Sequence, residues 1–503
     1  MESSIRNNVA SQEDFVLCVI LLLPLLFVVF KLISFPSSKK PPIPPGPKPW
    51  PILGNLLQIG KNAHISITHF AQTYGPLISL RLGGRLLVVA SSPAAAAAVL
   101  KTQDRLLSNR YVFHMTPDLA QHHECSLVFS PECNDHWRSL RSICKANLFT
   151  AKAIKSQASL RRRKMNEMIE FLLSKQGSVV EIRDFVLTTV FNALSNFIFS
   201  RDLIDFDGEG FNGLKQSFNN LKNLGLAPNL GDFYPFLRNL DVQGLRNKCS
   251  IYSKQINSTL DIIINQRRKL ASTDPSAPQD FLDVMIQSQF TNDHINYLVV
   301  ELLLAGTDTS TITVEWTMAE LLKNKNIIEK VREEVNTEMK QNSIDESEIY
   351  KLKYLWKCVK ETLRLHPPAP FLLPRIAPID CELMGYSIPK ESLIFVNVWG
   401  IGRDPSIWEE SLSFNPMRFS DCDHVDLKGN DFGYLPFGGG RRICPGFPMA
   451  TVLLPLILAN LIHNFEWSLP NGDEDFSKMD MEGMLGVTLL KKQPLKLIPK
   501  KRF

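Results

Sequence analysis

The sequence predicts a mainly α-helical protein with a minor β-sheet region, built as a single large domain behind an N-terminal transmembrane helix. Long segments carry apolar residues at three- and four-residue spacing, the period of an amphipathic helix. These segments are Ala158–Lys175, Tyr252–Lys269, Asn292–Lys323, Ile327–Lys340 and Met449–Phe465. Strand-like runs with β-branched residues are short and cluster at Leu77–Ala90 and Tyr386–Val398, which predicts a small sheet built from distant parts of the chain.

Composition narrows the classes of function. The 503 residues are 44% hydrophobic and 21% charged, as in an ordinary globular protein. A net charge of +5, from 56 basic and 51 acidic side chains, is far too weak to indicate a nucleic-acid partner. The nine cysteines are scattered and odd in number, which favours a reducing compartment. After Pro51 no repeat or second long linker divides the chain, and we expect Ser272–Gln279 to be a loop.

The N-terminal segment predicts a membrane anchor. Residues Phe15–Phe30 carry no charge, and apolar character resumes up to Phe35, which is just long enough to span a bilayer. A cleaved signal peptide is the alternative, but Glu13 and Asp14 precede the stretch where a signal would be basic, and no small-residue cleavage site follows it. We therefore expect a lumenal N-terminus at residues 1–14 and a transmembrane anchor at residues 15–35.

Positive charge and proline follow the predicted span. Lys31 follows the uncharged stretch, and Lys39, Lys40 and Lys48 lie beyond residue 35, so the positive-inside rule places the bulk of the chain in the cytosol. Residues 36–51 are rich in proline, which cannot continue a helix and favours a stiff, extended hinge. A ligand for a partner domain is the alternative. The large domain is expected at residues 52–503.

A glycine-rich loop places one cysteine in a distinctive setting. Phe437–Gly446 reads FGGGRRICPG, and three consecutive glycines let the backbone come close to a flat ligand. Cys444 follows at the start of an apolar helical segment, where the helix dipole and unpaired amide hydrogens stabilise a thiolate. A buried structural cysteine in a Gly-rich turn is the alternative.

This loop resembles the haem-binding loop of the cytochrome P-450 superfamily. It matches the pattern Phe-x-x-Gly-x-Arg-x-Cys-x-Gly at Phe437, Gly440, Arg442, Cys444 and Gly446. The resemblance implies the cytochrome P-450 fold and a bound haem b, with the Cys444 thiolate as the axial ligand of the iron. It also implies that Arg442 pairs with a haem propionate.

The longest predicted helix carries AGTDTS at residues 305–310. Polar groups stand there after a run of leucines, and they need partners or a task. A kink caused by the glycine and the hydroxyls is the alternative. The motif resembles the family's oxygen-binding groove, with Ala305 and Gly306 exposing backbone. The resemblance implies that Asp308 and Thr309 deliver protons to the oxygen being reduced.

Glu361 and Arg364, in ETLRLHPP, would alone be an uninformative surface ion pair. With FNPMRF downstream they resemble the family's Glu-x-x-Arg pair, which an arginine, here Arg418, completes in a buried charge network. Met417 stands where the family usually has a glutamate, which puts any further salt bridge in doubt.

Two more segments resemble haem contacts. Trp137 and Arg141, in WRSLR, match the Trp-x-x-x-Arg of a helix that contacts the haem propionates, although NDH precedes them where a Tyr-Gly turn is commoner. Arg375, after HPPAPFLLP, resembles another propionate contact, and a purely structural role is the alternative.

The resemblance implies a haem-thiolate monooxygenase with its catalytic domain on the cytosolic side of the endoplasmic-reticulum membrane. Such an enzyme takes O2, an apolar small-molecule substrate and electrons from NADPH, delivered singly by NADPH-cytochrome P-450 reductase. A haem-thiolate isomerase or dehydratase that needs no reductase, and a haem protein without turnover, are alternatives. Thr309 argues against family members that only rearrange peroxides.

The substrate is less clearly encoded. The hinge, AGTDTST and FGGGRRICPGFPMA resemble plant enzymes that act on alkaloids or on monoterpenoids such as geraniol, and Asn229–Leu245 favours the alkaloid group, of benzylisoquinoline or tropane type. Hydroxylation ranks ahead of phenol coupling or rearrangement. Candidate pocket walls are Ser108–Ser130, Lys222–Leu240, Val299–Ala305, Ala369–Ile376 and Met484–Thr488.

Overall fold

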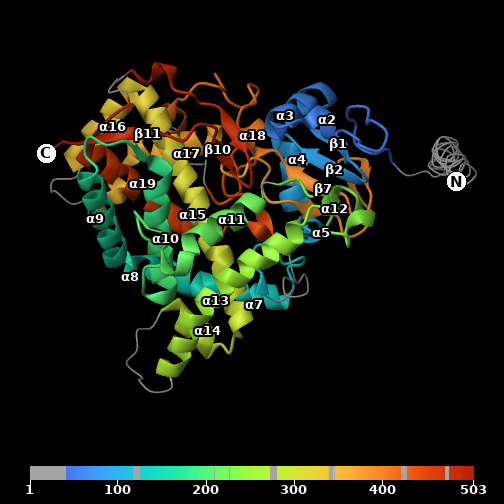
Figure 1. Ribbon diagram of the computed structural model, residues 1–503. Coiled ribbons are helices and arrows are strands. Elements are labelled where there is room, and N and C mark those ends of the chain that lie inside the picture. Colours follow the sequence, from blue (N-terminus) through green and yellow to red (C-terminus); the bar gives the residue numbers. More distant parts are fainter. Residues whose placement is uncertain are drawn as a thin grey trace, which may run out of the picture. The chain divides into compact units, whose positions relative to one another are not determined.

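The computed structural model describes residues 41–116, 125–208, 210–225, 227–271, 280–338, 344, 346–420, 427–470 and 475–502. The predicted lumenal segment, the transmembrane anchor and the loop Ser272–Gln279 lie outside these residues. Ile43–Phe503 forms one compact unit, in which helices predominate (Figure 1). The predicted fold class, mainly helical with minor sheets, is confirmed.

The helices are bounded as follows: α2 (Leu56–Ile59), α3 (Ala63–Tyr74), α4 (Pro93–Ala97), α5 (Asp104–Leu107), α7 (Asp135–Cys144), α8 (Ala151–Ser156), α9 (Ala158–Ser174), α10 (Ile182–Phe199), α11 (Leu214–Leu224), α12 (Leu230–Phe233), α13 (Leu245–Ala271), α14 (Phe281–Gln287), α15 (Asn292–Lys323), α16 (Lys325–Glu338), α17 (Lys353–Leu365), α18 (Val398–Ile401) and α19 (Phe447–Asn464). The predicted helix Asn292–Lys323 is confirmed, with the same bounds, as α15.

Within the described residues, four small sheets accompany the helices. The strands are β1 (Leu77–Leu82), β2 (Arg85–Ala90), β3 (Val180–Glu181), β4 (Arg375–Ile376), β5 (Cys381–Leu383), β6 (Tyr386–Ile388), β7 (Leu393–Val396), β8 (Phe465–Ser468), β9 (Gly483–Leu485), β10 (Leu489–Lys491) and β11 (Lys496–Lys501). The largest sheet has the order β1-β2-β7-β4. Its β2 pairs in parallel with β7, with Leu87 opposite Leu393, so the predicted sheet between distant segments is confirmed.

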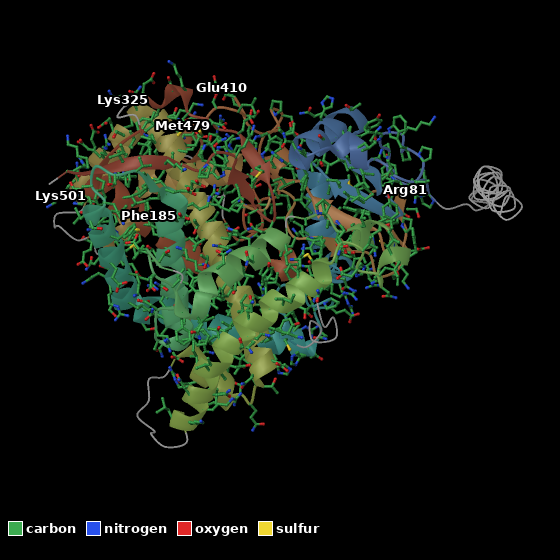
Figure 2. The ribbon with its side chains drawn as sticks, in the orientation of Figure 1. Arg81, Phe185, Lys325, Glu410, Met479 and Lys501 are labelled. Atoms are coloured by element: carbon green, nitrogen blue, oxygen red, sulfur yellow. The ribbon has the colours of Figure 1, made fainter. Side chains whose placement is uncertain are left out.

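The helix α15 forms the centre of the helical part. It packs against α10, α17 and α19, and Trp316 near its C-terminal end is fully buried. Within the described chain, α15 and α19 are long and apolar enough to cross a membrane, but most of each is buried in the domain, so both serve as core helices. In Figure 2, Phe185 of α10 lies among the helices, whereas Arg81, Lys325 and Lys501 lie toward the solvent.

The described part of the Pro-rich segment packs against β1. The Ser79 hydroxyl donates to the Pro44 carbonyl at 2.6 Å, and the Ser79 amide donates to the Pro45 carbonyl at 2.8 Å. A Cβ on Gly46 would lie 2.0 Å from the Ser79 carbonyl oxygen, so only glycine permits this approach. The segment therefore runs along the edge of the largest sheet.

Candidate active site

The glycine-rich loop wraps tightly before α19. Gly438 and Gly440 have φ values of 70° and 67°, a region that favours glycine. A Cβ on Gly440 would also lie 2.3 Å from the Leu100 carbonyl oxygen. The Cys444 amide donates to the Phe437 carbonyl at 3.0 Å, which closes the loop and presents the sulfur just before the helix begins.

The surroundings of Cys444 act on its thiol in opposite directions. Burial raises the pKa of the Cys444 thiol, whereas the amides of Gly446 and Phe447 and the positive charge of Arg141 favour the thiolate. Arg141 lies close because its guanidinium donates to the Ile443 carbonyl at 2.6 Å. The sulfur is thus prepared for a cationic partner that would complete the stabilisation of its negative charge.

Two of the expected propionate contacts are buried arginines. Arg442 donates to the carbonyls of Ser108 at 3.1 Å and Ser130 at 2.5 Å. Arg375 donates to the Leu107 carbonyl at 2.8 Å and lies 3.7 Å from Asp104. Burial lowers the pKa of Arg442, and burial together with the charge of Arg442 lowers the pKa of Arg375 to about 10.

Sequence reasoning missed a further member of this cluster, Arg110. Its guanidinium donates to the Leu373 carbonyl at 2.8 Å, while its buried Nε has no hydrogen-bond partner within the described part of the chain. Burial and the charges of Arg375, Arg442 and Arg141 hold its pKa well below the usual range. The residue lies inside the expected pocket wall Ser108–Ser130, but no motif signals it.

Trp137 joins the arginines to the loop that precedes α7. Its indole Nε1 donates to the Leu127 carbonyl at 2.9 Å, and the guanidinium groups of Arg442 and Arg141 lie 4.6 and 5.4 Å from its ring centroids. Asn134 explains the unusual NDH sequence, because its side chain accepts the Trp137 amide at 2.8 Å and caps α7.

The AGTDTS motif lies within α15. The Thr309 hydroxyl donates to the Ala305 carbonyl at 2.7 Å, and the Ala305 side chain is exposed. A Cβ on Gly306 would lie 2.7 Å from Leu194 Cδ1, which explains the glycine by close packing against α10. The groove side of the helix therefore offers one hydroxyl beside an open surface.

Among the described residues, no direct hydrogen bond joins the side chains of Asp308 and Thr309. One oxygen of Asp308 accepts the Lys222 ammonium at 2.8 Å, and the other accepts the Thr488 hydroxyl at 2.6 Å. Sequence reasoning placed Lys222 and Thr488 only as members of candidate pocket walls. Their contact with the acid follows from the tertiary fold.

Glu301, two turns before Asp308, was also missed as an individual residue. Its carboxylate accepts the amides of Leu127 at 2.8 Å and Val128 at 3.2 Å, and the Ser126 hydroxyl. Burial raises the pKa of Glu301 to about 7, against the lowering effect of these hydrogen bonds. A carboxylate on the core helix thus holds the loop that carries the partners of Trp137 and Arg442.

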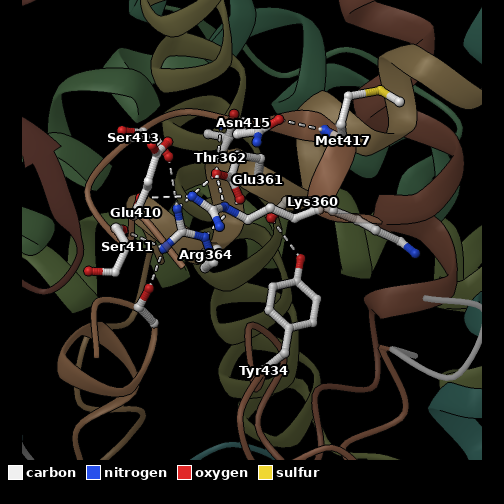
Figure 3. Close-up of polar contacts among 12 residues, drawn as sticks. Lys360, Glu361, Thr362, Arg364, Glu410, Ser411, Ser413, Asn415, Met417 and Tyr434 are labelled. Atoms are coloured by element: carbon white, nitrogen blue, oxygen red, sulfur yellow. Dashed lines mark hydrogen bonds and ion pairs between the residues drawn. The ribbon is translucent and has the colours of Figure 1, made fainter. Parts of the chain in front are cut away.

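The Glu-x-x-Arg pair forms a buried network on α17. Arg364 binds Glu361 through two bonds, of 2.7 and 2.8 Å, and both side chains are fully buried. Arg418 lies 3.2 Å from the same carboxylate, and the Asn415 amide donates to it at 2.8 Å. Figure 3 shows Arg364 facing Ser411 and Ser413, and its guanidinium also donates to the backbone carbonyls of both residues. The Met417 side chain is half exposed.

These residues fit a haem held by sulfur. The three buried guanidinium groups of Arg110, Arg375 and Arg442 exceed the negative charge of the nearby Asp104, and two propionates would balance them. The charge of Arg141 acts on both Arg110 and Cys444, so the arginine cluster and the sulfur are neighbours. The fold and these residues thus fit the class of helical proteins that hold a haem through a cysteine.

Comparison with known proteins identifies the family. The model of the family "Cytochrome P450" matches residues 44–498, and the chain belongs to that family. It is 44% identical, over 95% of this chain and 97% of the relative, to the "Probable (S)-N-methylcoclaurine 3'-hydroxylase isozyme 2" of Coptis japonica. It is 42% identical to the (S)-N-methylcoclaurine 3'-hydroxylase isozyme 1 of Papaver somniferum, over 96% of this chain and all of the relative.

A second activity occurs among the relatives. The corytuberine synthase of Coptis japonica is 39% identical over 97% of this chain and 100% of its own length. The chain is thus a cytochrome P450 monooxygenase, an oxidoreductase whose cofactor is a haem-thiolate.

Proposed function

We propose that this monooxygenase oxidises an alkaloid of the benzylisoquinoline type, by hydroxylation in preference to phenol coupling. The observation that carries the proposal is the near full-length similarity to proteins named as N-methylcoclaurine 3'-hydroxylases. The similarity to corytuberine synthase keeps a second type of oxidation on the same substrate class open. A monoterpenoid substrate and a reductase-independent isomerisation rank behind both.

Cys444 is proposed to hold the iron of haem b. Its place before α19 and the amides of Gly446 and Phe447 favour a thiolate, and Arg141 adds a positive charge. The bound haem supplies the activation of O2, and electrons come from NADPH through NADPH-cytochrome P450 reductase. Arg110, Arg375 and Arg442 are proposed to bind the propionates, for which Arg375 and Arg442 were expected from the sequence. Trp137 supports them.

The core helix α15 is proposed to supply the path by which protons reach the oxygen being reduced. The Thr309 hydroxyl both donates and accepts, and its bond to the Ala305 carbonyl fixes the direction of its proton. Asp308, one residue before, is proposed to replenish that proton from solvent. Gly306 keeps α15 close to α10, so that these groups stay in place.

The substrate pocket is proposed to be lined by the segments named from the sequence. Two of them meet at Asp308: the end of α11 through Lys222, and the turn between β9 and β10 through Thr488. Glu301, which belongs to a third segment, Val299–Ala305, holds a fourth, the loop at residues 126–129. We further propose that residues 15–35 anchor the protein once in the endoplasmic-reticulum membrane with the catalytic domain in the cytosol.

The test uses the enzyme purified with its haem and mixed with the plant reductase. The reduced, carbon-monoxide-treated protein should have the red-shifted absorption of a thiolate-bound haem. A panel of benzylisoquinoline and monoterpenoid compounds is then screened for shifts of the haem spectrum and for NADPH-dependent product. Conversion of a monoterpenoid alone, or conversion without NADPH, would refute the proposed substrate or reaction, and a Cys444→Ser variant with an unchanged spectrum would refute the ligand.

A further inference from the structure

Trp316 of the core helix α15 is held by side chains from two other parts of the chain. Its fully buried indole stacks on the His366 imidazole, with ring centroids 3.9 Å apart and an interplanar angle of 6°. The Lys491 ammonium lies 4.8 Å from the centroid of the same indole, a cation–π contact. The imidazole is fixed as well, because its Nε2 lies 2.7 Å from a carboxylate oxygen of Glu320. These contacts hold the indole in one orientation.

The N–H of this indole binds the strand β10. The Trp316 Nε1 donates to the Leu489 carbonyl at 3.0 Å, and the Leu489 amide donates to the Pro368 carbonyl at 3.0 Å. Thr488, the residue before Leu489, donates its hydroxyl to Asp308 at 2.6 Å. Asp308 and Trp316 lie roughly two turns apart on α15. The start of β10 is therefore attached to α15 at two places.

The hairpin of β9 and β10 extends from α15 to the segment that leads to Arg375. At the end of β9, Leu485 packs against the apolar cluster that contains Phe371. Two further apolar side chains of the hairpin, Met484 and Val487, are 44% and 51% exposed. Ligand pockets are lined mainly by apolar side chains, so these two are the parts of the hairpin suited to contact an apolar substrate.

We propose that Trp316 is a specificity-determining, positioning residue. Through Leu489 it sets the position of the turn that carries Met484 and Val487, and thereby which part of the substrate is presented for oxidation. The inference rests on the proposed substrate pocket, of which Met484–Thr488 forms one wall. Because Trp316 is fully buried in the core, it acts through the backbone of β10 and not by contact with the substrate.

The first test compares how the haem-loaded enzyme binds imidazole and the longer phenylimidazole, two iron ligands whose binding shifts the haem spectrum. Imidazole reports on the iron alone, whereas the phenyl ring of the second probe reaches further and reports on the pocket walls. Trp316→Phe keeps an aromatic ring but removes the indole N–H. The ratio of the two dissociation constants should shift by roughly fivefold or more in this variant, and a native ratio would overturn the proposal.

Trp467→Phe is the matched control. Trp467 is also a buried tryptophan, and its indole N–H donates to the Leu461 carbonyl at 3.2 Å, but it lies on β8, in a different sheet from the hairpin. Both variants lose one buried hydrogen bond and should lower the thermal midpoint by similar amounts. Only Trp316→Phe should shift the ratio; the same shift in Trp467→Phe would reduce the effect to general destabilisation and overturn the positioning role.

A second variant covers the case in which Trp316→Phe does not fold. Lys491→Met leaves the indole in place but removes the cation that holds it, so it should shift the ratio in the same direction. A native ratio in this variant would then overturn the proposal.

A second measurement needs no ligand. Hydrogen–deuterium exchange of the holoenzyme should accelerate at residues 483–490 in Trp316→Phe and remain native there in Trp467→Phe. Unchanged exchange at the hairpin in Trp316→Phe would refute the connection between the indole and the turn. Failure to convert any alkaloid would refute only the proposed substrate, because both probes bind the iron whichever substrate the enzyme takes.

Discussion

The Glu301 carboxylate of α15 accepts the amide hydrogen of Leu127 at 2.8 Å, and the carbonyl of that same Leu127 accepts the indole of Trp137. Arg442 bonds the same loop at the Ser130 carbonyl. A side chain of the core helix therefore fixes the backbone to which Arg442, the proposed propionate contact, is hydrogen-bonded.

This arrangement predicts a pH-dependent stability. Burial raises the pKa of Glu301 to about 7 from an ordinary value of 4.5, so the folded protein binds a proton that the unfolded chain has released between these values. The stability that the protonated group provides is full below pH 4.5 and declines as the pH rises to 7. The side chain of Glu301→Gln stays neutral, so the thermal midpoint of this variant should change less between pH 4.5 and pH 7 than that of the native protein.

The control for this prediction is Glu333→Gln, an exposed acid on α16 that should leave the pH dependence as in the native protein. Thermal melts at half-unit intervals between pH 4.5 and 8 provide the comparison. Parallel curves for native protein and Glu301→Gln would contradict the assigned shift.

Arg110 should contribute to haem retention. Its buried Nε lacks a partner among the described residues, and a propionate would satisfy it. In Arg110→Met, haem should transfer to a haem-free acceptor protein roughly tenfold faster or more, since a hydrogen bond to a charged group contributes about 1.5–3 kcal/mol. Arg138→Met, which removes an exposed arginine of α7 paired with Asp135, serves as the control; equal transfer rates in the two variants would exclude the propionate contact.

The buried Glu361–Arg364 pair should contribute far more to the free energy of unfolding than an exposed pair of the same spacing does. Glu361→Gln leaves a buried guanidinium without its charge partner, which should cost roughly 3–5 kcal/mol of unfolding free energy. Glu329→Gln breaks a pair of the same residue types at the same spacing on α16, where Glu329 is half exposed, and should cost roughly 1 kcal/mol or less. Yield of haem-loaded protein and thermal midpoint measure both, and similar losses would argue against burial as the cause.

Thr309→Ala should uncouple the enzyme. Without the hydroxyl beside Ala305, the proposed proton path would be interrupted, so peroxide should increase and product per NADPH should fall by roughly tenfold or more. Thr309→Ser should retain most of the coupling. Thr313→Ala removes an equivalent hydroxyl one turn later, bonded to the Thr309 carbonyl, and should couple normally; a normal product yield in Thr309→Ala would contradict the assignment.

Regular patterns in the sequence predicted the long helices and the sheet between distant segments well. The bounds of α15 and a sheet between the segments of β2 and β7 were predicted from apolar spacing and β-branched runs, whereas the parallel direction of that pairing was not. Helix α10 was missed because it is buried on nearly all sides, so its apolar residues have no amphipathic period.

The site was predictable only where a short motif carries it. The loop around Cys444 and the AGTDTS segment are local, so their residues could be named in advance. The partners of Asp308 lie 86 and 180 residues away in the chain, and Arg110 and Glu301 act on backbone carbonyls and amides of other segments. Such contacts arise from tertiary packing, so no regular spacing of residues in the sequence signals them.

The contact of Pro44 and Pro45 with Ser79 has a practical meaning for handling this protein. An unpaired outer strand is a template on which another molecule can add its own strand. Proline cannot donate a hydrogen bond to a neighbouring strand. The segment therefore covers the outer side of β1 without becoming a new edge strand itself. A chain that begins at residue 41 should therefore stay monodisperse. A chain that begins at residue 52 should leave the outer side of β1 uncovered and should aggregate.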